Sequence, residues 1–485
     1  ENVLRKEGFM SMEEKQNSQT FLDFNQSTFN PSTREEIVEI IKDCYKKNIP
    51  LEINGTKSKN KIGRNFQSEK TLSLSEYSGI IEYKPEELYI KVKAGTPVKD
   101  IVAELDKNNQ QLAFEPVDFG YLFKGSSDAG TIGGVVSANF AGPRRFKVGS
   151  ARDHLLGFQG VNGKGEIIKS GGTVVKNVTG YDLCKLLSGS FGTLTVLTDL
   201  SVKVLPKPDS SKTLIVNNPH LKKAIEYLGI ALSSSTDPSG GVFYPEKFEN
   251  KFTFNDLTHK GALTAIRIEG PLNSVDERVK RLVKELTLLE NEFSILESVQ
   301  TNIFWNKTKN LEVFSNSKSN LLRIVVPVSE TLNVIQKIKT FDANYFLDWG
   351  GSLIWLELEK INLKTLREIK EIAQKHSGYC TIIKVEEDLK ASADIFTIDP
   401  IKYKISEKIK KLQYELHINS NSRQSSCCFW CTEPYNTQPC YIPEYILNNK
   451  YHVYGSFCTP SCAVAFLLNE RINDSLKFER CALIN

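Results

Sequence analysis

The sequence predicts an α+β protein built from an α/β domain, an α+β second domain and a small C-terminal module. Strand and helix patterns alternate between residues 31 and 400, which is typical of mixed α and β domains. Pro206 and Pro208 interrupt this alternation, and seven of the ten cysteines lie after residue 426. The expected parts are a disordered leader at 1–27, a first domain at 28–208, a second domain at 209–400, a linker at 401–426, a cysteine-rich module at 427–470 and a tail at 471–485.

The first domain is expected to begin with a helix and to continue as alternating strands and helices. Residues 32–36 (Ser-Thr-Arg-Glu-Glu) can cap a helix whose apolar face includes Ile37, Ile40 and Ile41. A hairpin with a glycine-bearing turn is expected over 155–169. Further strands are expected at 50–53, 71–74, 88–92 and 193–205.

The second domain is expected to combine strands with amphipathic helices. Units of this length favour an α+β cap over the first domain. The clearest strands are expected at 213–216, 263–268, 322–327 and 353–358, and the clearest helices at 274–290, 329–340 and 362–375.

Length, composition and charge exclude several classes of protein. A chain of 485 residues exceeds the usual size of one core, so at least two domains are expected. The net charge of +4, from 62 basic and 58 acidic residues, argues against a chain that coats nucleic acid. No apolar run approaches the ~20 residues that span a bilayer, and no signal peptide is evident, so we expect a cytoplasmic protein.

Three glycine-bearing loops could hold a phosphate group. They are 54–59, 130–134 and 189–193, in which glycine lets backbone N–H groups approach an anion and hydroxyl side chains add donors. None matches the P-loop or the G-x-G-x-x-G turn, and each alone could be a tight turn. Three such loops in one α/β domain favour a dinucleotide that lies extended across them.

Two stretches of the first domain carry a resemblance to a known family. Residues 130–157 and 171–206 contain the motifs GTIGG, GPRR, SARD, KNVTGYDL and GSFGTL in this order. They closely resemble the E-subunit family of glycolate oxidase, within the PCMH-type FAD-binding superfamily of vanillyl-alcohol oxidase and D-lactate dehydrogenase. The resemblance covers about residues 28–411, with weaker matches at 267–270, Arg323 and 348–352. It implies a two-part FAD-binding domain beneath a cap domain.

The resemblance also implies roles for the loops. The first two would surround the pyrophosphate, 150–153 would follow the ribityl chain, and 142–145 with Lys176-Asn177 would lie near the flavin ring. From the residues alone, Arg152 and Asp153 could instead form only an ion pair, and Tyr181-Asp182 only a helix start. The implied cofactor-binding residues are Gly55, Thr56, Lys57, Ser58, Lys59, Gly130, Thr131, Ile132, Gly133, Gly134, Ser150, Arg152, Asp153, Val196, Leu197 and Thr198, the last three beside the adenine half.

The flavin is expected to be dissociable. Covalent attachment in the superfamily uses His or Cys in the equivalent loops, and residues 51–64 and 125–150 contain neither. His154 is the nearest candidate, and we interpret it as a structural histidine beside two leucines.

The implied reaction is the oxidation of glycolate or D-lactate, a small 2-hydroxy acid, to its 2-oxo acid. FAD supplies the redox chemistry, while the substrate needs a cation for its carboxylate and a base for its hydroxyl proton. The candidate cations are Arg144, Arg145, Arg267 and Arg323, and the sequence identifies no base.

Partner subunits follow from the resemblance as well. They would be a second flavin subunit and an iron–sulfur subunit, through which the chain could meet the inner membrane peripherally. The alternative function is therefore a flavin-binding assembly or electron-relay subunit with no activity alone. The chain departs from the family after the lysine-rich helix expected at 405–412, where the closing motif F-D-P-x-x-I-F-N-P-G-[KR] is absent.

The C-terminal cysteines predict a structural zinc site. Cys428 and Cys431 are separated by two residues, Cys458 and Cys462 by three, and four such thiolates can surround Zn²⁺. A thioredoxin-like redox pair is the alternative for C-x-x-C, but no βαβ pattern surrounds it. The fallback ligands are Cys427, Cys440 and His452, and Cys481 is expected to be free.

Residues 428–470 resemble an MYM/FCS-type finger of late transcription factors of large DNA viruses. The portion from Gly455 to Phe466 carries most of this similarity. Such fingers bind protein or nucleic acid, and the few Arg and Lys residues favour a protein partner. The unusual combination leaves two further possibilities, a chimeric chain and a zinc-finger regulator on an inactive flavin fold.

Overall fold

The chain divides into two units, Glu1–Thr397 and Ile398–Asn485. The computed structural model describes residues 26–64, 67–123, 127–128, 130–173, 181–217, 219–248, 253–254, 257–258, 261–289, 292–315, 318–397, 404–408, 410, 426–435, 439–447, 450–470 and 472–484. The mixed α and β fold class that the sequence predicts is confirmed.

The first domain opens with a small parallel sheet covered by α1 (Arg34–Lys47). Thr33 and Glu36 form the expected capping box, and the helix ends at Asn48, which adopts a left-handed conformation. The buried face of α1 packs into a core that continues into the second sheet of the domain. The strand order is β1 (Thr28–Phe29), β3 (Lys70–Ser73) and β2 (Leu51–Asn54).

The second sheet of this domain has five antiparallel strands. Its order is β4 (Ile80–Lys84), β5 (Tyr89–Lys93), β9 (Thr195–Lys203), β7 (Leu155–Asn162) and β8 (Ile167–Gly171). A short ladder joins β6 (Gln110–Gln111) to β10 (Leu205–Pro206). The remaining helices are α2 (Val98–Asp106), α3 (Gly120–Phe123), α4 (Ile132–Ala138), α5 (Arg145–Val148), α6 (Ala151–His154) and α7 (Leu183–Leu187).

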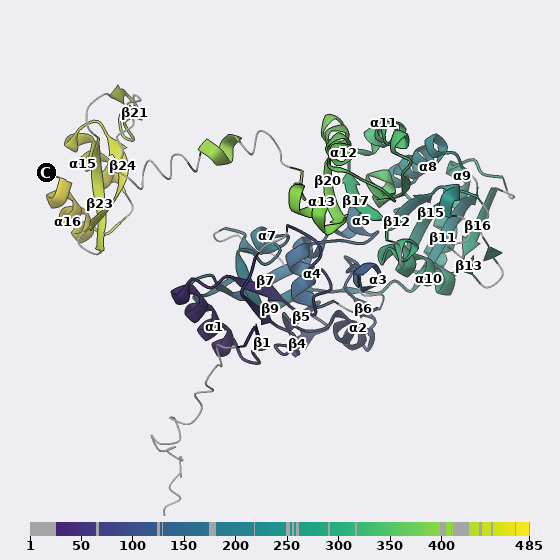
Figure 1. The fold of residues 1–485 in the computed structure, drawn as a ribbon, viewed down its shortest axis with the longest axis horizontal. Coiled ribbons are helices and arrows are strands. Elements are labelled where there is room, and N and C mark those ends of the chain that lie inside the picture. The colour runs from purple at the N-terminus through teal and green to yellow at the C-terminus, as the bar shows by residue number, and fades with distance from the viewer. Residues whose placement is uncertain are drawn as a thin grey trace, which may run out of the picture. The chain divides into compact units, whose positions relative to one another are not determined.

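The cap domain is built on an eight-stranded antiparallel sheet (Figure 1). Its order is β16 (Phe293–Leu296), β11 (Ser210–Asn217), β15 (Leu263–Gly270), β12 (Gly240–Tyr244), β18 (Asn344–Asp348), β19 (Leu353–Leu358), β17 (Asn320–Val325) and β20 (Tyr379–Lys384). Its helices are α8 (Leu221–Ser233), α9 (Leu272–Glu285), α10 (Ser298–Lys309), α11 (Val328–Ile338), α12 (Leu363–Lys375) and α13 (Glu387–Ser392). A minor hairpin pairs β13 (Thr253–Phe254) with β14 (Leu257–Thr258).

The two faces of the cap sheet bury different sets of side chains. One face packs beneath α8, α9, α11 and α12, whereas the other packs against α10 and against aromatic residues of the first domain such as Phe119 and Phe140. Side chains alternate between faces along a strand, and Leu322 and Ile324 lie under the helices. Arg323 therefore points toward the first domain, as does Arg267 between Ile266 and Ile268.

The second unit is a hairpin packed against two helices (Figure 1). Its buried core consists of Cys428, Ile442, Phe457, Ala463 and Leu467. The elements are β21 (Ser426–Cys427), β22 (Pro434–Tyr435), β23 (Cys440–Leu447), β24 (Lys450–Phe457), α15 (Pro460–Asn469) and α16 (Asp474–Ile484).

Most sequence-based elements appear with shifted ends. The helix expected at 274–290 is α9, which begins two residues earlier and ends at Glu285, and the strand expected at 322–327 is β17, which ends at Val325. Residues 404–408 and 410 are helical, as expected for the lysine-rich segment. Most of the expected leader and linker lie outside the described residues.

Candidate active site and candidate metal centre

The three glycine-bearing loops come together around α4. A Cβ atom added at Gly55 would lie 2.6 Å from the Thr131 hydroxyl, so the first loop packs directly on the second. Gly133 N–H donates to the Ala94 carbonyl at 2.8 Å, and Gly189 N–H donates to the Val136 carbonyl at 3.2 Å. The structure therefore brings together loops that are more than 130 residues apart in the sequence.

Lys59 directs its ammonium group at this meeting point. Its Nζ lies 3.4 Å from the place that a Cβ at Gly130 would occupy and 3.9 Å from that at Gly134. Burial lowers the pKa of Lys59 to about 8, although Asp118 partly opposes this. Among the described residues, no carboxylate lies within 4 Å of the ammonium. A cation beside exposed glycine backbone is suited to hold a phosphate group.

Buried polar atoms beside the loops also lack partners. Both side-chain amide atoms of Asn54 and the Oγ1 of Thr198 are enclosed without a hydrogen-bond partner in the described part of the chain. Thr198 is linked to the glycine loops because its carbonyl accepts from Ala94 N–H at 2.6 Å. Orphaned buried polar atoms are rare, and a bound ligand is one way to satisfy them.

A largely apolar cleft of about 380 Å³ lies beside strands β2, β7 and β9. Ile53 of β2, Val161 of β7 and Val196 of β9 line it, and Val161 and Val196 face each other across the ladder. The cleft is of the size and polarity that a planar base needs. Val196, one of the residues expected beside the adenine half, therefore lines this cleft.

Residues 150–153, expected beside the ribityl chain, begin with a capping box. Ser150 N–H and Oγ donate to Asp153 at 2.8 and 3.0 Å, and Arg152 N–H donates to Asn139 Oδ1 at 3.0 Å, beside the end of α4. The partner of Asp153 is Arg145, at 3.3 Å, and not Arg152. Lys176 and Asn177 lie outside the described residues.

Asp182 and His154 have local structural roles. Asp182 caps α7, since its carboxylate accepts from Lys185 N–H at 3.0 Å, which confirms a helix start. His154 is buried with Nε2 3.0 Å from the Val148 carbonyl and Nδ1 3.3 Å from the Lys203 carbonyl, and burial lowers its pKa. Both ring nitrogens are engaged by backbone, as expected for a structural histidine.

Two of the candidate arginines are neutralised by buried glutamates. Arg144 donates from Nε and Nη2 to Glu269 at 2.9 and 2.5 Å, and Arg267 donates from Nη1 to Glu115 at 2.8 Å. Arg144 also lies 3.1 Å from Glu115. Burial alone would raise the pKa of both carboxyls, but the guanidiniums outweigh it and hold the pKa of Glu269 at about 2. Neither arginine therefore offers a free charge.

The other two candidate arginines flank one indole ring. The guanidinium carbon of Arg323 lies 4.8 Å from the centre of the Trp349 ring, and that of Arg145 lies 5.9 Å from it. Trp349 Nε1 donates to the Gly142 carbonyl at 3.0 Å, which joins the cap to the arginine-rich loop of the first domain. Arg145 is paired with Asp153, whereas Arg323, only 9% exposed, forms no ion pair with any described residue.

A series of ring contacts connects Arg323 to Lys59. Lys59 Nζ lies 5.9 Å from the Phe119 ring, whose centre lies 5.0 Å from that of Phe140. Arg323 lies 5.7 Å from the Phe140 ring.

The sequence analysis did not identify the acidic residues of this region. Glu115 and Asp348 are buried, and the side chain of Glu269 is only 8% exposed. Glu115 and Glu269 lie in ordinary-looking segments, and only the fold reveals their partners. Asp348 interrupts the apolar run Tyr345-Phe-Leu-Asp-Trp349, a signal that could have identified it.

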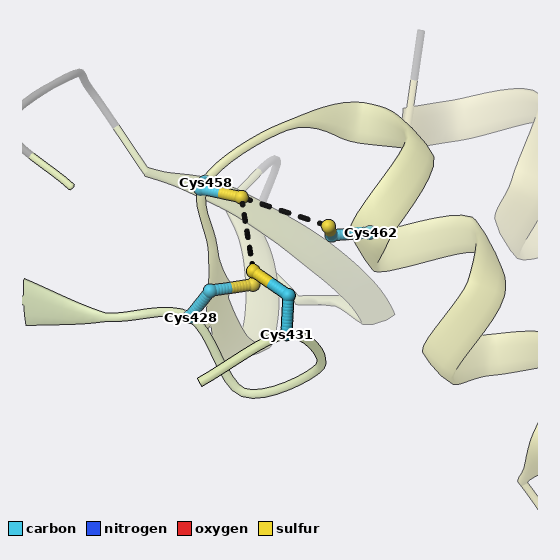
Figure 2. A group of neighbouring side chains, drawn as sticks. All are labelled: Cys428, Cys431, Cys458 and Cys462. Atoms are coloured by element: carbon cyan, nitrogen blue, oxygen red, sulfur yellow. Dashed lines mark hydrogen bonds between the residues drawn. The ribbon is translucent and has the colours of Figure 1, made fainter. Parts of the chain in front are cut away.

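Four cysteines of the second unit form a compact group (Figure 2). They are Cys428, Cys431, Cys458 and Cys462, and their sulfur atoms all lie within 4.8 Å of one another. The Cys431–Cys458 and Cys458–Cys462 Sγ distances are 3.7 and 3.6 Å. A tetrahedron of thiolates about 2.3 Å from one ion has edges of about 3.8 Å, so the group can hold a metal.

The chain supports this group with local structure. Thr459 caps α15 by accepting from Cys462 N–H at 3.2 Å, and this fixes the second pair of cysteines. Burial would raise the pKa of Cys428, but hydrogen bonds from backbone amides outweigh it and lower the pKa to about 6. The same coupling raises the pKa of Cys431 and Cys458, so the thiols of this group share their protons.

The fold and the loops define an FAD-binding flavoprotein of the PCMH type. A family model described as an FAD binding domain matches residues 26–171. Two solved structures share the fold: an alkyldihydroxyacetonephosphate synthase (TM-score 0.57, 16% identity, 72% of this chain and 71% of that chain) and 4-ethylphenol oxidase from Gulosibacter chungangensis (TM-score 0.55, 11% identity, 75% and 81%).

Curated relatives narrow the family further. Glycolate oxidase subunit GlcE of Escherichia coli (strain K12) is 31% identical over 354 residues, which cover 72% of this chain and 86% of that protein. Subunit GlcD of Bacillus subtilis (strain 168) is 26% identical over 65% of this chain and 67% of its own length. A D-lactate dehydrogenase from Anaerostipes hadrus is 32% identical over 40% of this chain and 39% of its own length. The chain belongs to the glycolate oxidase subunit GlcE family of FAD-dependent hydroxy-acid oxidoreductases. Within the described residues, no helix is both long and apolar enough to cross a membrane.

Proposed function

We propose that the chain binds FAD without a covalent bond and oxidises a small 2-hydroxy acid, glycolate or D-lactate, to its 2-oxo acid. Lys59 and the backbone of 55–59 and 130–134 would hold the diphosphate, and the cleft beside Val196 would hold the adenine. The orphaned amide of Asn54 and hydroxyl of Thr198 support a polar ligand in this position. When bound, FAD accepts the two electrons that leave the substrate.

The unpaired guanidinium of Arg323 is the observation on which the substrate class depends. It is a buried cation without a carboxylate partner among the described residues, on the cap face that points toward the first domain. The Tyr379 side chain is hydrogen-bonded to Arg323, but a neutral phenol does not balance its charge. A buried charge without a counter-ion is costly, so an anionic ligand would relieve that cost. The carboxylate of a 2-hydroxy acid would supply the negative charge. Arg145, which also lies near the Trp349 ring, could provide a second positive charge for it.

Anaerobic bleaching of the flavin in the purified full chain tests this function. We expect glycolate or D-lactate to bleach it, and Arg323→Leu to lower kcat/KM about 10- to 100-fold through loss of charge-assisted hydrogen bonds. Arg323→Lys should recover part of this loss. The control is Arg281→Leu, which removes an exposed guanidinium of α9 bonded to Ser235. A wild-type flavin that neither acid bleaches would contradict the proposal.

A second candidate function is supported by the names of the relatives, two of which are subunits of glycolate oxidase. We propose that this chain also works within an assembly, with a second flavin subunit and an iron–sulfur subunit as partners. It could then relay electrons and have little activity alone. Bleaching that requires added partner subunits would favour this role over independent activity.

We also propose that the ion of the second unit is Zn²⁺ and that its role is structural. Four cysteine ligands leave no open position for a substrate, which is typical of structural zinc. A unit with five buried core residues gains folding energy from such an ion. The exposed rings of Phe429 and Trp430 beside the ligands would be available to a protein partner.

A further inference from the structure

Asp348 precedes a turn whose backbone conformation is unusual. It ends β18, and the next three residues, Trp349, Gly350 and Gly351, all have positive φ angles of 53, 65 and 101°. Such a conformation is unfavourable for a bulky residue such as tryptophan, and residues of this kind cluster at functional sites. The Trp349 bond to the Gly142 carbonyl holds this turn against the arginine-rich loop.

The carboxylate of Asp348 has few partners. Its side chain is almost completely buried, and Oδ1 accepts from Trp349 N–H at 2.6 Å. Oδ2 accepts no hydrogen bond, and no cation lies within 4 Å, among the residues that the structure describes. The charged and titratable groups that face it are Arg267 and Arg323, which favour its ionised form, and Glu115 and Tyr244, which oppose it.

The lack of a nearby cation distinguishes Asp348 from Glu115 and Glu269. Glu115 and Glu269 are each bonded to guanidiniums, which makes them weak bases. Burial raises the pKa of Asp348 to about 7, the range in which a carboxylate both ionises and accepts a proton effectively. The three acids are close in space, but only Asp348 is able to exchange a proton near neutral pH.

The position of Asp348 matches the shape of the proposed substrate. A 2-hydroxy acid carries its hydroxyl group on the carbon next to its carboxylate, so its anchor and its base must be neighbours. Arg323 lies against the ring of Trp349, the residue that follows Asp348, and its charge is felt at the Asp348 carboxylate. Leu322, Ile324 and Leu347 pack under the helices, so Arg323 and Asp348 lie on the same face of the cap sheet and could act on one ligand from the same side.

We propose that Asp348 is the general base for the hydroxyl proton of the substrate. This inference rests on the proposed function. The O–H bond breaks and its proton forms a carboxylic acid on Asp348. The C2–H bond would break with its hydrogen and electron pair leaving as a hydride, for which FAD, when bound, would be the acceptor, while the C2–O bond becomes a carbonyl. The two electrons and both hydrogens are thereby accounted for.

The test compares wild type, Asp348→Asn and Glu357→Gln in the full chain with FAD bound. Glu357 is a matched control because it is a buried carboxylate of the same sheet on β19, bonded to Asn344. We expect Asp348→Asn to lower the rate of anaerobic flavin bleaching by about 10²- to 10⁴-fold, the usual contribution of a general base. The rise in rate through about pH 7 should disappear in this variant and persist in the control.

Calorimetry with oxalate provides a readout that does not require turnover. Oxalate offers carboxylates to Arg323 but has no hydrogen to transfer, so Asp348→Asn should still bind it. In wild type, the added negative charge should drive proton uptake by Asp348 near pH 7, measured in buffers of different ionisation enthalpy, and Asp348→Asn should lack it.

The outcomes separate the two proposals. If Asp348→Asn bleaches as fast as wild type with the same pH profile, Asp348 is not the base and the proposed function stands. Oxalate binding by wild type without any proton uptake that depends on Asp348 also overturns the inference. If wild-type flavin is not bleached by either acid, with or without partner subunits, both proposals fail.

Discussion

Arg144 and Glu269 form a bidentate ion pair between the two domains of the first unit. Nε and Nη2 of the guanidinium donate to the two carboxylate oxygens at 2.9 and 2.5 Å. Arg144 belongs to the arginine-rich loop of the FAD-binding domain, and Glu269 lies on strand β15 of the cap. Together with Glu115 and Arg267 they form a buried cluster of alternating charges that fixes the cap over the flavin domain.

Removing one charge from this cluster should weaken the fold. Glu269→Gln leaves the guanidiniums of Arg144 and Arg267 to share the single carboxylate of Glu115, and breaking such a buried pair typically costs about 3–5 kcal/mol of unfolding free energy. Urea denaturation followed by tryptophan fluorescence would measure the loss. The control is Asp237→Asn, which breaks the more exposed Lys147–Asp237 pair and should cost less than about 1 kcal/mol. Equal effects of the two variants would contradict a structural role for the cluster.

Affinity for FAD should depend on pH through Lys59. Its ammonium has a pKa of about 8, and a bound diphosphate would raise that pKa, so binding takes up a proton above pH 8. The dissociation constant should be constant below pH 8 and rise up to about tenfold per pH unit above it. Lys59→Met should weaken binding by about 10- to 100-fold and remove this dependence.

Titration of the apoprotein with FAD, followed by flavin fluorescence, measures both effects. Lys61→Gln is the control, since Lys61 is an exposed lysine of the same segment. Retention of the pH dependence in Lys59→Met would exclude Lys59 as its origin.

The carboxyl of Asp348 should make the first unit less stable as the pH rises, whereas an acid in an ion pair makes a protein more stable as the pH rises. Its pKa is raised from 3.8 to about 7, so the folded form retains a proton that the unfolded form loses between these values. Stability from this group is complete below about pH 4 and is lost as the pH rises to 7. Asp348→Asn should therefore gain stability relative to wild type between pH 4.5 and 7.5, by an amount of the order of 3 kcal/mol. Parallel pH profiles from urea denaturation would show that the carboxyl is not buried in its neutral form.

The second unit should depend on its metal while the first does not. Cys458→Ser removes one of four thiolates, so we expect loss of the bound zinc and unfolding of residues 426–484 with the flavin content unchanged. Elemental analysis should find one zinc ion per wild-type chain. Cys481→Ser should retain it, because Cys481 is not part of the four-cysteine group. A zinc-free wild type with stable circular dichroism after chelation would contradict the assignment.

The sequence supported the local features of the site well. The glycine loops, the cap of α1 and the cysteine spacing depend on residues that are neighbours in the chain, and their patterns have direct physical meanings. Cys428 and Cys431 or Thr33 and Glu36 can be paired without knowledge of the fold. The family resemblance added the order of the loops and the cofactor.

The charge cluster and the base could not be predicted in the same way. Glu115 and Arg267 are 152 residues apart, and their contact depends on the register of β15 and on the packing of the cap. Four arginines were equivalent candidates in the sequence, and only burial and ion pairing distinguish Arg323 from Arg144. Asp348 became a candidate only when its carboxylate was found without a cation.

The lone ammonium of Lys59 has a consequence for how the protein matures. Before the flavin is loaded, this charge lies beside glycine backbone, and among the described residues no carboxylate lies within 4 Å of it. A bound diphosphate would supply a counter-ion, so we expect the flavin-loaded protein to resist proteolysis better than the apoprotein.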